Sequence, residues 1–187
     1  MEIKTGRQVI DIEIKALNLL KNYISKDFVK VVNLLLKNKG KIIVSGIGKS
    51  GHIASKIAST FSSVGSPSFY IHPSEANHGD LGMLEKKDVV ILISNSGETS
   101  ELINLILYCK KLGISIISIT SEPNSTLSRE SNLNLLIPKN IEACPLELAP
   151  TSSTTCTLAL GDALAVTLLK KKKFTESDFR ELHPGGK

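Results

Sequence analysis

Residues 94–99 (Ser-Asn-Ser-Gly-Glu-Thr) stand between a run of apolar residues and a helical pattern. Residues 88–93 read as a buried strand, and apolar residues recur at helical spacing over 102–107. Such a turn directs free backbone N–H groups and the positive end of a helix dipole to one point. The chemistry that this predicts is binding of a phosphate monoester, and we call residues 94–99 the phosphate cradle. Four hydroxyl groups can add donors: Ser94, Ser96, Thr99 and Ser100.

A second glycine-rich loop, residues 45–52 (Ser-Gly-Ile-Gly-Lys-Ser-Gly-His), also lies between a strand and a helix. Its spacing excludes the P-loop, which needs four residues between the first glycine and Gly-Lys-Ser. Gly46, Gly48 and Gly51 match G-x-G-x-x-G, but no acidic residue follows about 20 positions later to hold a ribose. We therefore expect no nicotinamide or flavin cofactor. We interpret Lys49 as a cation that faces a substrate anion, with an exposed loop lysine as the alternative.

Residues 72–80 (His-Pro-Ser-Glu-Ala-Asn-His-Gly-Asp) bring two histidines and two carboxylates into one short segment. Histidines at this spacing with acids nearby could ligate a metal ion. His72 and His78 could equally contact a substrate or cap a helix. The segment by itself leaves these roles open.

Candidate acids and bases are scattered along the chain. Glu98 lies in the cradle and Glu101 follows it, Glu142 precedes Ala-Cys-Pro, and His183 begins His-Pro-Gly-Gly. Proton transfer at carbon requires a base, an acid and a group that polarises a carbonyl. A carboxylate with a raised pKa would suit that work. Each of these residues, taken alone, could also be a solvated or frayed side chain.

A third hydroxyl-rich turn, residues 149–155 (Ala-Pro-Thr-Ser-Ser-Thr-Thr), stands at the start of a long apolar helix. Its hydroxyl groups could simply cap that helix. Three turns of this kind on one sheet nevertheless favour a polyhydroxylated, phosphorylated ligand, with Thr151 and Ser152 among its contacts.

The elements that must position these residues follow from periodicity. Two helical patterns come first, and Gly40 is expected to end the second. The first is apolar around more than one face, which suggests burial against another subunit. Alternating strands and helices then predict an α/β three-layer sandwich, with a mainly parallel, Rossmann-like or flavodoxin-like sheet. Ligands of such sheets bind beyond the carboxyl ends of the strands. We predict strands at 41–45, 68–71, 88–93, 115–120 and 133–137, and helices at 53–64, 101–112 and 153–169, with a helical turn at 127–131.

Length and composition indicate one domain, residues 1–187, with 41% hydrophobic and 22% charged residues. No apolar run approaches the roughly 20 residues that span a membrane, and no secretory signal opens the chain. Three widely spaced cysteines suit a cytoplasmic protein with reduced thiols. The net charge is +5, but lysines cluster at an expected helix end (170–173) and aromatic content is 4%. We therefore expect neither a nucleic-acid nor a membrane partner.

Taken together, the motifs resemble the sugar isomerase (SIS) domain, a family of phosphosugar isomerases and phosphosugar-binding regulators. The resemblance is greatest to its arabinose-5-phosphate isomerases. They interconvert D-ribulose 5-phosphate and D-arabinose 5-phosphate and feed 3-deoxy-D-manno-octulosonate (Kdo) synthesis for lipopolysaccharide or capsule. It implies an isomerase that works through a cis-enediol and requires no cofactor. The matching segments are 45–52, 75–83, 94–99, 142–146, 148–155, 161–165 and 183–186.

The resemblance also implies roles for individual residues. Position by position, it makes Lys49, Glu101, Glu142 and His183 catalytic. It implies that no metal is required, although His72 could bind an inhibitory zinc ion. The implied contacts to sugar and phosphate are Ser50, Gly65, Ser66, His72, His78, Ser94, Ser96, Thr99, Thr151 and Ser152.

Family members are typically homotetramers whose sites share residues between neighbouring chains, so we expect the same here. Longer members continue past His-Pro-Gly-Gly into paired CBS domains, whereas this chain ends at Lys187. We therefore expect an isomerase domain alone. The alternatives are a non-catalytic module that senses phosphosugars, or an isomerase for another phosphosugar.

Overall fold

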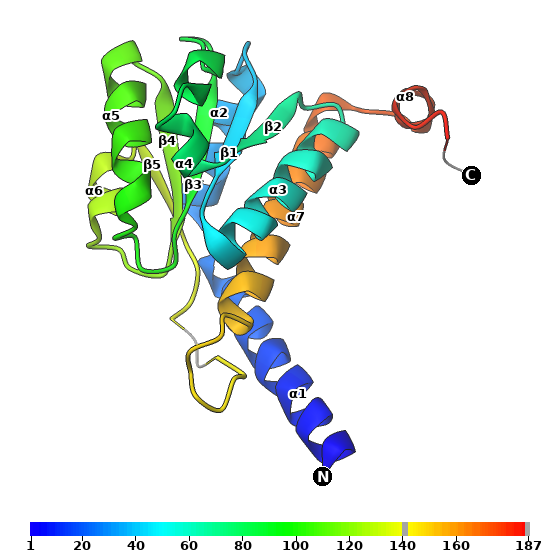
Figure 1. Cartoon of the computed structure of the whole chain (residues 1–187). Helices are drawn as coiled ribbons and strands as arrows, with labels where there is room; N and C mark the ends of the chain where they lie inside the picture. The colour runs from blue at the N-terminus through cyan, green and yellow to red at the C-terminus, as the bar shows by residue number, and fades with distance from the viewer. Residues whose placement is uncertain (140–141, 186–187) are drawn as a thin grey trace.

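In the part of the chain that the computed structural model describes, residues 1–139 and 142–185, five parallel strands form one sheet. The strand order is β2-β1-β3-β4-β5 (Figure 1). The chain therefore reverses its direction of travel across the sheet between β1 and β3, the place where such folds bind ligands. The bounds are β1 Ile42–Ser45, β2 Ser68–Ile71, β3 Val89–Ile93, β4 Ser115–Thr120 and β5 Leu133–Leu136.

Helices cover both faces of the sheet, as predicted. Alternate strand residues serve the two cores: Ile91 packs with one group of helices and Leu92 with the other. The first group is α1 Glu2–Leu20, α2 Lys26–Lys37, α3 Gly48–Ser63 and α7 Ser152–Lys172. The second is α4 Pro73–Ala76, α5 Ile103–Leu112 and α6 Thr126–Glu130. Three 3₁₀ turns (η1 Lys21–Tyr23, η2 Asp80–Met83 and η3 Ser100–Leu102) and α8 Glu176–Leu182 complete the described elements.

All five predicted strands are present within one or two residues of their expected bounds. The helix after β1 was expected at 53–64 but begins at Gly48. The reason is that Gly48 adopts a φ of +59°, which turns the chain into the helix early, and the amide of Gly51 already bonds the carbonyl of Ile47. Lys49 therefore lies in the first turn of α3 rather than in a loop.

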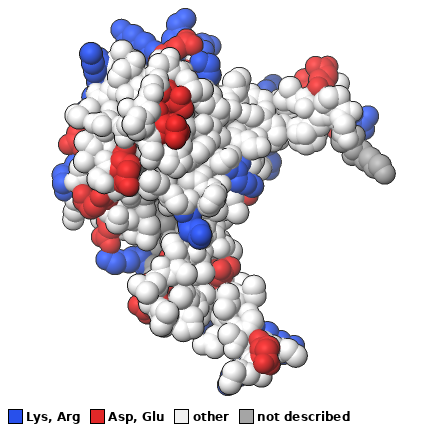
Figure 2. Space-filling model, in the orientation of Figure 1, with Lys and Arg blue, Asp and Glu red and all other residues white. Residues whose placement is uncertain are grey.

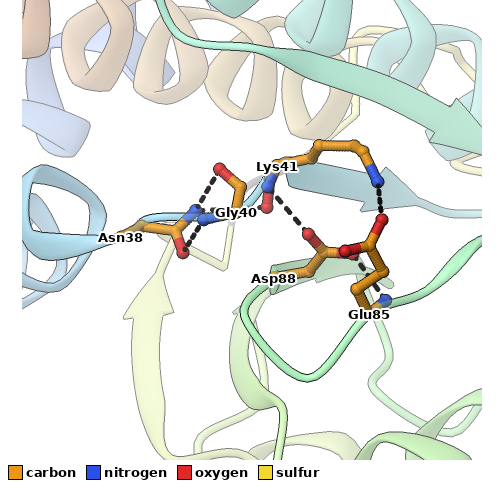
Figure 3. A network of polar contacts seen from close by, with 5 residues as sticks. All are labelled: Asn38, Gly40, Lys41, Glu85 and Asp88. Atoms are coloured by element: carbon orange, nitrogen blue, oxygen red, sulfur yellow. Dashed lines mark hydrogen bonds and ion pairs between the residues drawn. The ribbon is translucent and has the colours of Figure 1, made fainter.

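A polar network aligns β1 with β3 at the amino edge of the sheet (Figure 3). The carboxylate of Asp88 accepts from the amides of Lys41 and Glu85, each at 2.8 Å, and the side chains of Lys41 and Glu85 form an ion pair at 2.9 Å. The side-chain Nδ2 of Asn38 donates to the carbonyls of Gly40 and Lys41. The network thus joins β1 and β3 at their N-terminal ends, opposite the carboxyl ends beyond which ligands of such sheets bind.

Gly40 does not end α2, contrary to the prediction. The helix ends at Lys37, and Asn38 is its C-cap in an extended conformation. Gly40 instead lies against the β3 segment, where a Cβ would come within about 2.4 Å of the carbonyl oxygen of Lys87. Close approach of two backbones, rather than helix termination, explains this glycine.

Helix α7 is long and apolar enough to cross a membrane by length and composition alone. Half of its apolar window is buried in the fold, and it packs against α1, α2 and α3. It is therefore a core helix of the domain.

Helices α1 and α8 extend away from the sheet as two arms (Figure 1). Of the nineteen residues in α1, only Ala16 and Leu20 are buried, and α8 has no buried residue. The apolar side chains Ile10 and Ile14 of α1 are about half exposed. Within one chain, the first helix therefore lacks the cover that its pattern predicts.

Candidate functional site

The segments that follow β1, β2, β3 and β5 meet at the carboxyl edge of the sheet. They carry most of the residues expected in the site, since parallel strands bring their carboxyl ends to the same edge. Helix α7 runs back across the sheet, so its N-terminus lies at this edge and its last turn at the opposite one. The residues collected here are Lys49, Ser50, His72, His78, Ser94, Ser96, Thr99, Glu101, Glu142, Thr151 and Ser152.

The phosphate cradle is a closed turn held by its own hydroxyl groups. The side-chain oxygens of Ser94 and Thr99 lie 2.7 Å apart, and Ser94 Oγ accepts from the amide of Gly97 at 3.0 Å. Ser94 is buried, whereas Ser96 is exposed and accepts from the amide of Glu98. A 3₁₀ turn, η3, follows the cradle, so α5 begins at Ile103, two residues after the expected start at Glu101.

Two contacts with the start of α6 fix the shape of the cradle. Gly97 has a φ of +67°, and a Cβ there would collide with the side chain of Ser125. Glu98 turns away from the cradle and accepts from the amide of Thr126 at 2.8 Å, at the start of α6. This contact, with Arg129 nearby, holds the pKa of Glu98 below its ordinary value. Glu98 is therefore a brace between β3 and α6.

The loop that precedes Lys49 lies against the end of β3. A Cβ on Gly46 would come within 3.1 Å of the carbonyl oxygen of Ile93, the residue before the cradle. Lys49 and Ser50 follow in the first turn of α3. Lys49 is exposed, and no described carboxylate forms an ion pair with it. Its ammonium group is available to an anion at this edge.

His72 caps α4, one of the roles that the sequence left open. Its Nδ1 accepts from the amide of Ser74 at 3.2 Å, which leaves the other ring nitrogen for a ligand. His78 is exposed just beyond α4. Helix α4 packs beside the turn η3 that carries Glu101, and Asn104 of α5 donates to Asn77 at 2.9 Å. Both histidines therefore lie on segments that flank Glu101.

Glu142 binds the N-terminus of α7. Its Oε2 accepts from Thr151 through the amide at 2.7 Å and the hydroxyl at 2.9 Å, and from the amide of Ser153 at 3.3 Å. Thr151 Oγ1 accepts in turn from the amide of Ala143 at 2.8 Å. Three of the hydrogen bonds that Glu142 accepts thus reach the same oxygen, Oε2. The carboxylate of Glu142 therefore joins the segment after β5 to the N-terminus of α7.

The pKa of Glu142 lies below its ordinary value. Burial does push its pKa upward, but the hydrogen bonds from Ser153 and Thr151 outweigh burial and lower the pKa. Glu142 is thus a carboxylate, able to accept a proton, at neutral pH. Beside it, the fully buried Oγ of Ser152 has no hydrogen-bond partner among the described residues. A buried hydroxyl group that lacks a protein partner at a candidate site can form a hydrogen bond with a ligand.

Gly65 and Ser66 do not join this group within one chain. They follow α3, whose sixteen residues span about 24 Å, and so lie at the amino edge of the sheet. There, Lys172 at the end of α7 donates to the carbonyl of Gly65 at 3.0 Å and to Ser66 Oγ at 2.7 Å. The ring of Phe174 occupies the space next to Gly65.

His183 also lies apart from the carboxyl edge. It ends α8, on an arm that leaves the fold after Phe174. Its ring stacks on Phe179 with 3.8 Å between centroids, and its Nδ1 lies 2.8 Å from the carbonyl oxygen of Phe179. The ring is therefore held in place by α8 itself. The rest of its motif includes Gly186, which lies outside the described residues.

Two residues that support the site were not identified from the sequence. Ser125 fills the space beside Gly97, and the Tyr70 hydroxyl donates to the carbonyl of Gly46 at 2.8 Å. Both act across the sheet rather than along the chain, so no local pattern marks them. Within residues 1–139 and 142–185, no three potential metal-ligating side chains come together.

Comparison with known proteins identifies relatives of this chain in both sequence and structure. Residues 35–167 match the model of the SIS domain. The chain is 51% identical over 184 residues to the arabinose 5-phosphate isomerase KdsD of Pseudomonas aeruginosa, covering 98% of this chain and 56% of the relative. It is also 51% identical over 183 residues to KdsD of Escherichia coli K12, with the same coverage. The chain thus spans about half the length of these curated relatives.

A solved structure agrees with these sequence relatives. The protein c3406 of E. coli CFT073, in complex with arabinose 5-phosphate, superimposes with a TM-score of 0.95 at 44% identity. The match covers 97% of each chain. Sequence motifs, strand order and both comparisons agree, and the chain belongs to the SIS domain family.

Proposed function

We propose that this chain is an isomerase domain that interconverts D-arabinose 5-phosphate and D-ribulose 5-phosphate, within a pathway to Kdo for lipopolysaccharide or capsule. The observation that supports this most is the meeting of the cradle, Lys49, Glu101 and Glu142 at one edge of the sheet. The chain is also 51% identical over 98% of its length to an arabinose 5-phosphate isomerase. We place the reaction in the cytoplasm, where the absence of a disulfide among the three cysteines, all in the described chain, is expected.

The substrate phosphate binds in the cradle in this proposal. The amide of Gly97 and the hydroxyls of Ser94, Ser96 and Thr99 surround one turn, and hydrogen bonds to an anion are stronger than those to a neutral group. Lys49 adds a positive charge from the first turn of α3. Charges of both signs are interspersed over the face in Figure 2, which favours a small anion over a nucleic acid.

The chemistry moves one proton between two carbons. A base removes the proton from C2 of arabinose 5-phosphate, which forms a cis-enediol, and the proton returns at C1 to give ribulose 5-phosphate. The proton of one oxygen passes to the other, so no redox partner is consumed. Glu142, ionised at neutral pH, is a candidate carbon base together with Glu101 and His183. Lys49 stabilises the oxygen that gains negative charge.

A complete site takes residues from more than one copy in this proposal. Gly65, Ser66 and His183 lie at the far end of the fold from the cradle, so a second chain must supply them if they contact the same substrate. Helix α1 offers a surface for such assembly. A mainly apolar groove of about 320 Å³ runs between its C-terminal end and α7; Asn18 and Lys21 add polar groups to a lining of Leu17, Leu20, Ile24, Ala159, Leu160 and Ala163. We expect a homotetramer.

The test is an isomerase assay. Purified protein is incubated with D-ribulose 5-phosphate, and arabinose 5-phosphate is measured chromatographically, with fructose 6-phosphate and sedoheptulose 7-phosphate in parallel. We expect arabinose 5-phosphate to form at a rate that exceeds turnover of the other sugars. Thermal stabilisation by sugar phosphates without any product would instead identify a phosphosugar sensor. Faster conversion of another sugar would assign a different isomerase.

A further inference from the structure

The hydroxyl group of Tyr70 holds the loop that precedes Lys49. Tyr70 lies on the edge strand β2, and its Oη donates to the carbonyl of Gly46 at 2.8 Å. Its ring forms one wall of a hollow of about 260 Å³ between α3 and β2. Gly48, Gly51, His52, Ser55 and His72 form the rest of the lining.

The glycines around this contact show how closely the loop is held. A Cβ on Gly51 would lie 2.8 Å from the Tyr70 hydroxyl and 2.7 Å from the carbonyl oxygen of Gly46. Helix α3 therefore leaves room for the hydroxyl by having a glycine in its first turns. On its other side, Gly46 packs against the carbonyl of Ile93. The loop is clamped between β2 and the end of β3.

We propose that Tyr70 is a positioning residue for Lys49. The hydroxyl fixes the carbonyl of Gly46, and with it the start of α3, so that the ammonium group of Lys49 is held beside the phosphate cradle. This inference rests on the proposed isomerase function, and it adds a residue that acts through Lys49 without touching the substrate.

The chemistry of the contact supports this role. Gly46 is buried, so its carbonyl loses a hydrogen-bond partner that water does not readily replace when the hydroxyl is removed. Burial raises the pKa of Tyr70, and the hydroxyl therefore keeps its proton and donates throughout the neutral pH range. The contact is constant and does not act as a pH switch.

The first experiment compares Tyr70→Phe with Tyr108→Phe. Tyr108 is a half-buried tyrosine of α5, outside the site, and its variant is the matched control for loss of a hydroxyl. For Tyr70→Phe we expect kcat to fall about tenfold, since misplacing a catalytic group by a fraction of an ångström has effects of this order. The control keeps wild-type turnover. Wild-type kcat in Tyr70→Phe would overturn the inference.

A double-mutant cycle shows whether the effect passes through Lys49. If it does, adding Tyr70→Phe to Lys49→Gln costs less than about twofold, because the group being positioned is already gone. A full tenfold further loss would mean that Tyr70 acts elsewhere, and would overturn the inference.

Hydrogen exchange of the segment 46–51 gives a readout that does not depend on turnover. Tyr70→Phe should raise its exchange rate, while Tyr108→Phe leaves it unchanged. Unchanged exchange in Tyr70→Phe would overturn the inference even if the wild-type protein had no isomerase activity. Absence of activity in the wild type would contradict the proposed function alone.

Discussion

Thr151 and Glu142 hold each other at the N-terminus of α7. The amide and the hydroxyl of Thr151 both donate to Oε2 of Glu142, at 2.7 and 2.9 Å. The contact joins the segment after β5 to the core helix. A single residue thus caps α7 and presents a candidate base.

Replacing the carboxylate by an amide should separate these two roles. Glu142→Gln keeps an oxygen that can accept from Thr151 but removes the negative charge, so we expect turnover to fall at least about a hundredfold with little change in fold. Isomerase kinetics and circular dichroism check this. Glu147→Gln, an exposed change in the same loop, is the control and should keep its activity. Near-normal turnover of Glu142→Gln would remove this residue from the mechanism.

The lowered pKa of Glu142 predicts a pH dependence of stability. Because its hydrogen bonds favour the charged form, the stabilisation is fully present above the ordinary carboxyl value near 4.5 and is lost as pH falls through the lower folded-state pKa. The difference in unfolding free energy between wild type and Glu142→Gln should therefore be constant from pH 7 to about pH 5 and shrink in more acidic solution. Urea unfolding at several pH values measures it. A difference that grows in acid would contradict the assignment.

The cradle should depend on the missing side chain of Gly97. Gly97→Ala introduces strain at a φ of +67° and a collision with Ser125. Gly113→Ala is the matched control, since Gly113 has a φ of +71° and nothing within 4 Å of its Cβ position. We expect the control to lose about 1 kcal/mol of unfolding free energy, the usual cost of a left-handed residue. Gly97→Ala should lose more, and its KM should rise at least about tenfold as the phosphate donors move. Equal effects on stability with unchanged KM would argue against the cradle.

Mixing inactive variants tests whether a site spans two copies. His183→Ala should lose turnover at least about a hundredfold, as Glu142→Gln does. If one site uses Glu142 of one chain and His183 of another, co-refolding equal amounts of the two variants should restore about a quarter of wild-type activity by random pairing. Refolded single variants are the controls. A mixture no more active than its components would contradict a shared site built from these two residues.

Much of this architecture could be predicted from the sequence. Strands β1 to β5 are short, mainly apolar runs bounded by polar or glycine residues. The apolar residues that predict each strand therefore belong to the strand itself. The position of the cradle follows in the same way, because β3 ends at Ile93 and the hydroxyl residues come next. These signals are local. The period of the apolar residues and the presence of turn-forming residues can be read from neighbouring positions, without knowledge of the distant segment that each element packs against.

Other features depend on contacts that no local pattern contains. The clamp of Tyr70 on Gly46 and the role of Gly40 both arise where two segments far apart in the chain approach closely. The lowered pKa of Glu142 depends on distant contacts in the same way, since its hydrogen-bond donors come from the start of the next helix.

The sequence by itself determined the family, the parallel sheet and the identity of the candidate residues. Only the tertiary structure decided how these residues divide: one group at the carboxyl edge of the sheet, and Gly65, Ser66 and His183 at the other end of the fold. The physical reason is the direction of the helices. A sixteen-residue α3 carries the chain about 24 Å from Lys49 to Gly65, and that separation follows from packing along the sheet rather than from residue types.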